Sequence, residues 1–364
     1  MKIQEITDYL ESFFPLIYQE NYDNSGLIIG DKNEKAVGIL ITLDCTNEVV
    51  DEAIKLNCNL IIAHHPILFN PIKSITGKNY IERIIIKAIK NNIAIYAIHT
   101  NLDNVKNGVN SVIADNIGLT NTKILRPKHN YIKKLTFYCP ISESQKIKDK
   151  LWEIGAGNIG DYSHCSFSSL GKGTFMAGEN SCPTLGEKNK LHVEKEEKIE
   201  MVFFSNLQDK ILNKLFSEHP YEEVAYELYH IDNANKDIGS GLYGNLKKSM
   251  DSQDFLYKLK QVMQTDCIRY TNLDNKKINK VAICGGSGSF LLEDAKRIKA
   301  DIFISSDFKY HQFFDADNQI IIADIGHYES EQFTKDLIYN LLVKKFTKFA
   351  ILLSKINTNP IKYL

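Results

Sequence analysis

The chain has 364 residues, of which 43% are hydrophobic and 24% charged, a balance typical of a globular protein with two or three domains. Lys and Arg together number 44 and Asp and Glu 45, so the net charge of −1 creates no overall field that would attract nucleic acid or a membrane surface. No apolar run reaches the roughly 18 residues of a membrane span. The opening residues are typical of an amphipathic helix rather than a signal peptide, so we expect a soluble, cytoplasmic protein.

The seven cysteines are scattered along the chain, odd in number, and include no Cys-x-x-Cys pair. Disulfide frameworks and thiolate zinc sites both need closely spaced, paired cysteines. We therefore expect reduced cysteines, most of them packed in the interior.

The first third alternates helical and strand patterns. We expect helices at residues 4–14, 48–56, 80–90 and 108–118, and strands at residues 27–30, 37–43, 60–63 and 93–98. Thr46 is a suitable N-cap for the second of these helices. The order strand, helix, strand predicts parallel pairing through crossover connections.

Two of these strands end in polar clusters. The apolar run at residues 60–63 is followed by His64, His65 and Pro66, and the run at residues 93–98 is followed by His99 and, four positions later, Asp103. Ligands in open α/β sheets bind where parallel strands end, and imidazole is a common metal ligand. The histidine pair could equally cap a loop, and His99 could be a ligand, an orienting group or a strand-end histidine.

The middle of the chain has a different pattern. Strands are expected at residues 134–139, 201–204 and 224–230 and helices at residues 144–154 and 207–217, with a Gly/Ser-rich tract at 155–178 between them. The Lys/Glu run at residues 186–200 is interpreted as a solvated loop or edge. The β-α-β, β-α-β order predicts a small ferredoxin-like module, and residues 238–244 are expected to lead back to the first domain.

The last third returns to the earlier alternation. Helices are expected at residues 252–263 and 291–298 and strands at residues 280–284, 302–304 and 320–323. The glycine-rich turn at residues 285–290 could bind a phosphate at a helix N-terminus or could simply be a tight turn.

The last two strands also end in groups that can bind metal or transfer protons. Asp307 and His311 are four residues apart, as are His327 and Glu331, so each pair is expected to share one helical face. A His/Glu pair of this kind can hold a metal ion, although it can also be a surface hydrogen bond.

Five motifs together resemble the dinuclear metal-centre family of GTP cyclohydrolase I type 2 homologues, also called Nif-three-like proteins. The motifs are Asp23-Asn24-Ser25-Gly26-Leu27, His64-His65-Pro66-Ile67-Leu68-Phe69, His99-Thr100-Asn101-Leu102-Asp103, Asp307-Phe308-Lys309-Tyr310-His311 and Gly326-His327-Tyr328-Glu329-Ser330-Glu331. The sequence departs from the family pattern at Tyr22, usually tryptophan, at Ser305-Ser306, usually Thr-Gly, and at Ser111, usually an acid.

The resemblance implies an α/β fold with a Nif-three-like core formed by residues 1–126 and 239–364. It also implies an inserted ferredoxin-like α+β domain at residues 127–238, similar to the signalling protein PII and copper-tolerance proteins. The segments Gly155-Ala156-Gly157-Asn158-Ile159-Gly160 and His219-Pro220-Tyr221-Glu222-Glu223 carry this second likeness. Family members assemble as hexamers, so a homohexamer is expected.

The same resemblance implies that two divalent metal ions bind to five residues, with Glu331 bridging them. These residues are His64, His65, Asp103, His327 and Glu331. Nitrogen and carboxylate ligands suit Zn, Fe, Mn or Ni, and the sequence leaves that choice open.

We expect a metal-dependent hydrolase that acts on a small-molecule substrate, a nucleotide or other phosphate-containing compound. Asp307 and His311 are the expected catalytic proton-transfer groups. The alternatives are a non-catalytic, metal-dependent regulatory oligomer and a metal chaperone.

Overall fold

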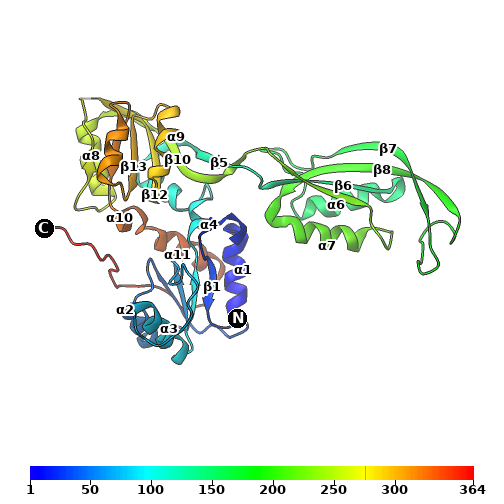
Figure 1. Cartoon of the computed structure of the whole chain (residues 1–364), viewed down its shortest axis with the longest axis horizontal. Helices are drawn as coiled ribbons and strands as arrows, with labels where there is room; N and C mark the ends of the chain where they lie inside the picture. Colours follow the sequence, from blue (N-terminus) through cyan, green and yellow to red (C-terminus); the bar gives the residue numbers. More distant parts are fainter. Residues whose placement is uncertain (275) are drawn as a thin grey trace. The chain divides into compact units, whose positions relative to one another are not determined.

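The computed structural model describes residues 1–274 and 276–364. These residues form two compact units, one made of Met1–Pro127 and Lys236–Leu364 and the other of Lys128–Asn235. Both units mix helices and strands, which confirms the predicted α/β class (Figure 1). Every helix among the described residues is too short or too polar to cross a lipid bilayer.

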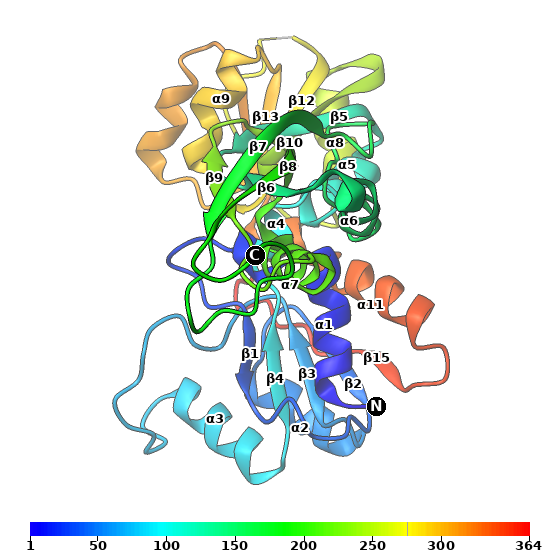
Figure 2. The ribbon, with the colours of Figure 1, turned by 90° about the vertical axis from the view of Figure 1, so that its right-hand side faces the viewer.

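The larger unit contains a five-stranded sheet in the order β1-β4-β3-β2-β15 (Figure 2). Its strands are β1 (Gly26–Ile29), β2 (Ile39–Thr42), β3 (Leu60–Ala63), β4 (Ala94–Ala97) and β15 (Ile351–Leu353). β15, β2, β3 and β4 are parallel, as the crossover pattern predicts, and β1 is antiparallel to β4. The carboxyl ends of β3 and β4 therefore lie at the same edge.

Helices cover both faces of this sheet, which explains why its central strands, β2, β3 and β4, are buried at every position. α2 (Asn47–Lys55) and α3 (Tyr80–Lys90) pack on one face, where their apolar residues join Leu40, Ile61 and Ile95 in one core. α1 (Ile3–Phe13) and α11 (Thr334–Lys345) lie on the other face. The Thr46 side chain caps α2 by accepting a hydrogen bond from the Val49 N–H, as predicted.

The second sheet of the larger unit has the order β11-β14-β13-β12-β10-β5. Its strands are β5 (Leu119–Lys128), β10 (Asn235–Asp251), β11 (Arg269–Tyr270), β12 (Lys277–Ser287), β13 (Ile302–Ser306) and β14 (Ile321–Asp324). β12, β13 and β14 are parallel. α5 (Val109–Ile117) and α8 (Ser252–Val262) pack against β12, and α9 (Leu292–Arg297) packs into a core around Phe303.

Several short helices complete the larger unit. They are α4 (Thr100–Asp103), α10 (His327–Glu331) and the 3₁₀ helices η1 (Leu16–Tyr18), η3 (Ser289–Leu291) and η4 (Tyr310–Ala316). α4 begins three residues after the last residue of β4, and α10 begins three residues after the last residue of β14, so each lies close to the end of a parallel strand.

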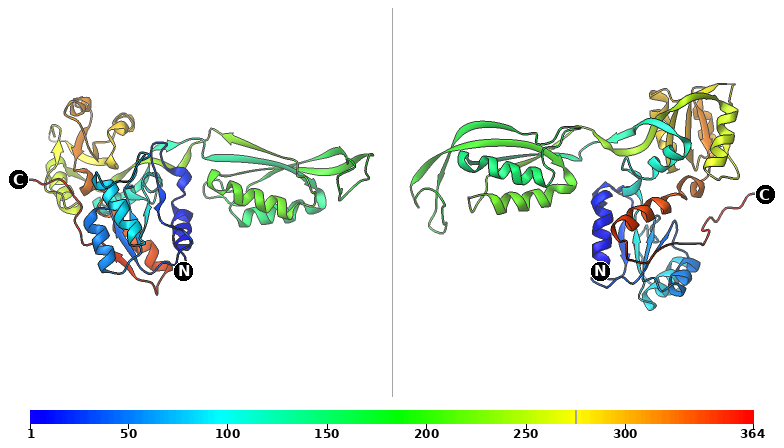
Figure 3. Two further views of the ribbon diagram at one scale, coloured as in Figure 1. Left: turned by 60° about the horizontal axis from the view of Figure 1, so that its bottom comes forward. Right: turned by 180° about the vertical axis from the view of Figure 1, so that it is seen from behind.

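The smaller unit is a four-stranded antiparallel sheet in the order β7-β8-β6-β9. Its elements are β6 (Ile132–Pro140), α6 (Ile141–Glu153), β7 (Phe167–Met176), β8 (Leu191–Phe204), η2 (Ser205–Leu207), α7 (Gln208–Glu218) and β9 (Tyr226–Ile231). The two long helices lie on the same face of the sheet (Figure 3) and enclose a core around Phe137 and Phe203. The element order is β-α-β-β-α-β.

The predicted solvated loop or edge at residues 186–200 fits residues 186–190, which are exposed, and is wrong for residues 191–200. β8 begins at Leu191 and pairs with β7 on one side and β6 on the other, so it is an interior strand. Two of its carboxylates pair with lysines of neighbouring elements, Glu200 with Lys134 and Glu197 with Lys148. The run of charged residues hides the apolar alternation by which a strand is usually recognised.

Candidate metal site

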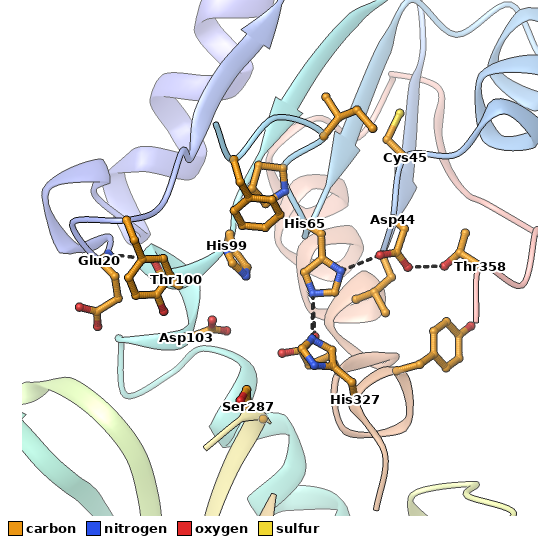
Figure 4. A pocket seen from close by; sticks show the side chains of 18 of the residues that line it. Glu20, Asp44, Cys45, His65, His99, Thr100, Asp103, Ser287, His327 and Thr358 are labelled. Atoms are coloured by element: carbon orange, nitrogen blue, oxygen red, sulfur yellow. Dashed lines mark hydrogen bonds and ion pairs between the residues drawn. The ribbon is translucent and has the colours of Figure 1, made fainter. Parts of the chain in front are cut away.

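The carboxyl ends of strands from both sheets of the larger unit meet at one cluster (Figure 4). β3 places His64 and His65 there, β4 and α4 place His99 and Asp103, and β14 and α10 place His327 and Glu331. The Nε2 atoms of His65 and His327 are 3.4 Å apart, so the two imidazoles lie in one compartment although 262 positions separate them in the chain.

The cluster contains two groups of potential metal ligands that share Glu331. One group is His65, His327 and Glu331, and the other is His64, Asp103 and Glu331. Within each group the ligand atoms lie within 4.8 Å of one another. Glu331 Oε2 lies 2.9 Å from His65 Nε2 and 3.2 Å from His327 Nε2, while Oε1 lies 3.8 Å from His64 Nε2. The Glu331 carboxylate thus offers one oxygen to each group.

The His64 group contains two polar atoms that lack a hydrogen-bond partner in the described part of the chain. His64 is fully buried, and its Nδ1 donates to the Ile98 carbonyl at 2.8 Å, so in the neutral ring Nε2 is the acceptor. Neither His64 Nε2 nor Asp103 Oδ1 finds a donor, although both are buried and only 3.6 Å apart. Buried polar atoms are nearly always paired, so two acceptors facing each other fit a cation.

Carboxylates orient the other imidazoles. The Nδ1 atoms of His65, His327 and His99 lie 2.7, 2.6 and 2.7 Å from Asp44, Asp307 and Asp23, respectively. A carboxylate on one ring nitrogen fixes the tautomer and turns the other nitrogen toward a ligand, which is typical of metal-binding histidines. Asp307, predicted as a catalytic group, is therefore in contact with His327.

The charges of the cluster are strongly coupled. Burial alone would lower the pKa values of His65 and His327, but the carboxylates that contact them outweigh it and raise these pKa values to about 10 and about 11. Burial and the neighbouring Glu331 raise the pKa of Asp103 to about 7. Burial also acts to raise the pKa of Glu331, but the imidazoles around it hold that pKa well below its usual range. The cluster therefore brings together imidazoles and carboxylates that can release a proton when a cation binds.

The structure does not bring His311 to the cluster. His311 is exposed, and its ring contacts Tyr310 and Phe314 instead. The predicted shared helical face with Asp307 is wrong, because Asp307 has a left-handed backbone (φ 59°) and the 3₁₀ helix η4 begins only at Tyr310. The four-residue spacing had assumed a continuous α-helix.

Comparison with known proteins identifies the family. Residues 1–360 match Duf34/NIF3 (NGG1p interacting factor 3). The chain belongs to the Duf34/NIF3 family. A Staphylococcus epidermidis relative named GTP cyclohydrolase 1 type 2 homolog is 36% identical over 367 residues, covering 100% of both chains. A Bacillus subtilis relative of the same name is 35% identical over 368 residues, covering 99% of this chain and 98% of the relative.

Solved structures agree with this assignment. A Bacillus cereus protein described as related to NIF3 is 37% identical and superposes with a TM-score of 0.87, covering 100% of this chain and 99% of its own. A Staphylococcus aureus protein is 32% identical with a TM-score of 0.79 and the same coverage. The expected family and its α/β fold are thus confirmed.

The glycine-rich turn of this Duf34/NIF3 chain makes room for Glu331. The N–H groups of Gly285 and Gly286 donate to the side chains of Asn110 and Ser330, each at 2.9 Å, so neither is directed at a phosphate. Gly286 has a φ of 62°, and a Cβ added there would overlap Glu331 Oε1. The tight-turn interpretation therefore fits better than the phosphate-binding one.

A cavity of about 910 Å³ opens beside the cluster. Its wall includes the potential ligands His65, Asp103, His327 and Glu331. Aromatic side chains also line it, namely Tyr22, Phe69, Tyr80, Phe290 and Tyr328. Asp44 lines the same cavity, and sequence reasoning missed its role. The available signal was its position directly after the strand at residues 37–43, where the neighbouring parallel strands carry His64 and His99.

Proposed function

We propose that this Duf34/NIF3 protein binds two divalent metal ions and is a metal-dependent hydrolase of a nucleotide or another phosphate-containing small molecule. The observation that carries the proposal is the pair of ligand groups sharing Glu331, one of which contains the unpaired acceptors of His64 and Asp103. His65, His327 and Glu331 would hold one ion, and His64, Asp103 and Glu331 the other. This mixture of imidazole and carboxylate suits Zn²⁺, Fe²⁺, Mn²⁺ or Ni²⁺.

The chain's own residues have separable roles in this proposal. A bound pair of divalent ions would supply a water of lowered pKa and a clamp for substrate oxygens. Asp44 and Asp307 hold the imidazoles of His65 and His327 by their Nδ1 atoms, which keeps each Nε2 free for a ligand. Asp307 is half exposed, so it can also pass a proton to solvent from its place beside His327.

The cavity supports a small-molecule substrate. Its volume of about 910 Å³ lies within the range of small-molecule sites. Exposed aromatic rings in its wall, among them Tyr22 and Phe69, offer flat apolar surfaces for a nucleotide base. The name shared by the curated relatives, GTP cyclohydrolase 1 type 2 homolog, supports the same substrate class.

Metal analysis of the purified protein, followed by a turnover screen, tests the proposal. The metal-free protein is loaded with each candidate ion, dialysed and assayed by elemental analysis, and two ions per chain are expected. His64→Ala and His327→Ala should each reduce the metal content. His311→Ala is the matched control, because this histidine is exposed and belongs to neither ligand group, and it should retain two ions.

The loaded protein is then incubated with a panel of nucleotides and phosphate esters, and products are separated by chromatography. Turnover that disappears in His64→Ala but persists in His311→Ala supports a hydrolase. Two bound ions without any turnover would overturn the hydrolase and leave a metal-dependent binding protein. A wild-type chain that retains no metal would overturn the whole proposal.

We also propose a homohexamer, on the family resemblance. Light scattering of the full chain after size-exclusion chromatography should give six times the mass of one chain, and a monomeric mass would contradict it.

A further inference from the structure

The segment that follows β15, residues 354–364, lies against the metal cluster. Its beginning is anchored to α2, where the Ser354 hydroxyl donates to Glu52 Oε2 at 2.5 Å and the Lys355 N–H donates to Glu52 Oε1 at 3.0 Å. Four of its residues, 358–361, line the cavity beside the cluster. The segment is therefore part of the site rather than a loose extension of the sheet.

Thr358 contacts Asp44, the carboxylate that orients the potential ligand His65 (Figure 4). The Thr358 hydroxyl donates to Asp44 Oδ2 at 2.6 Å, while Asp44 Oδ1 contacts His65 Nδ1 at 2.7 Å. Each oxygen of the carboxylate thus has a different partner, so Thr358 fixes the rotation of the group that orients His65. His65 Nε2 in turn lies 2.9 Å from Glu331 Oε2.

Asn359 contacts Glu329, which lies in α10. Its side-chain N–H donates to Glu329 Oε1 at 2.9 Å. Glu329 is buried and lies in α10 between His327 and Glu331. Adjacent residues of this segment therefore contact two different elements of the site. Thr358 contacts Asp44, which follows β2 of the first sheet, and Asn359 contacts Glu329 of α10.

We infer that residues 354–364 form a positioning strap for the metal site, in which Thr358 fixes the Asp44–His65 pair and Asn359 fixes α10. The inference rests on the proposed metal binding. It assigns a positioning role to residues that are not themselves metal ligands. Removing a partner of a metal-bound histidine commonly costs about 10- to 100-fold in metal affinity. Thr358 acts one step further away, so a loss of about tenfold is expected.

The test compares Thr358→Val, which has nearly the same shape but no hydroxyl, with Thr358→Ser, which keeps the hydroxyl. Lys355→Ala is the control within the same segment, because its side chain is exposed. Zn²⁺ affinity and stoichiometry are measured on the full chain by competition with a chromophoric chelator, and the metal-free proteins are compared by thermal unfolding. Thr358→Ala provides a second hydroxyl-free variant if Thr358→Val does not fold.

We expect Thr358→Val to bind two ions, one of them about tenfold more weakly, and Thr358→Ser and Lys355→Ala to stay within about twofold of the wild type. The loss should vanish when Thr358→Val is made in an Asp44→Ala background, because the hydroxyl then has nothing to position. Unchanged affinity in Thr358→Val, an equal loss in Thr358→Ser, or a loss that persists without Asp44 would overturn the strap. A wild-type chain that binds no Zn²⁺ would instead overturn the metal site and the strap together.

Discussion

Gly286→Ala should separate backbone strain from damage to the metal site. Gly286 has a φ of 62°, and the left-handed conformation costs a residue with a Cβ about 1–2 kcal/mol. The added Cβ would also overlap Glu331 Oε1 and lie 3.3 Å from its Cδ and 3.5 Å from His327 Cε1, so it would meet the side chains of two potential ligands. Relief requires the carboxylate to move by about 1 Å, and a misplacement of that size can cost about 100-fold in a site that depends on exact geometry.

Gly118→Ala provides the matched control. Gly118 ends α5 with a φ of 84°, and the nearest atom to an added Cβ is Lys258 Nζ at 3.9 Å, so this variant carries the strain without the overlap. Urea unfolding followed by circular dichroism should show a loss of about 1–2 kcal/mol in Gly118→Ala and at least that much in Gly286→Ala. Chelator competition should show about 100-fold weaker Zn²⁺ binding, roughly 3 kcal/mol, in Gly286→Ala alone. Equal Zn²⁺ affinities in the two variants would refute the role assigned to this turn.

Three further outcomes follow from other parts of the chain. Glu331→Ala should lower bound metal to at most one ion per chain by elemental analysis, and an unchanged two would contradict the shared ligand. In the smaller unit, burial lowers the pKa of His219, whose Nδ1 accepts from the Tyr221 N–H and whose Nε2 donates to the Tyr138 carbonyl. The folded state favours the neutral ring, so the stabilisation from His219 is present above the ordinary pKa of about 6.5 and is lost as the pH falls through the lower folded-state pKa. Urea midpoints measured from the fluorescence of Trp152, the only tryptophan, should therefore decline less steeply at acid pH in His219→Gln than in the wild type. Phe303→Ala should cost about 3–5 kcal/mol in urea unfolding because the ring is fully buried in the second sheet's core, and a cost below 1 kcal/mol would mean that this core repacks.

Local pattern was a good guide to the parallel strands of both chain ends. The apolar runs before His64, His99 and Asp307 are strands buried on both faces, and the helices between them begin and end close to their capping residues. Pattern failed at β8, because a run of charged residues there forms a strand that is paired along both of its edges. It failed again at His311, since spacing reports a shared face only when the intervening backbone is helical.

The sequence by itself determined which side chains stand where strands end, because strand exits and helix starts depend on residues close together in the chain. Local pattern did not indicate how near those side chains come to one another, and only the family resemblance implied that five of them converge on two ions. His65 and Glu331 are 266 positions apart, and Thr358 and Asp44 are 314 apart. Only the packing of the two sheets and the path of the segment after β15 bring these residues within hydrogen-bonding distance. Contacts between residues so far apart in the chain depend on how the whole core packs rather than on any local preference.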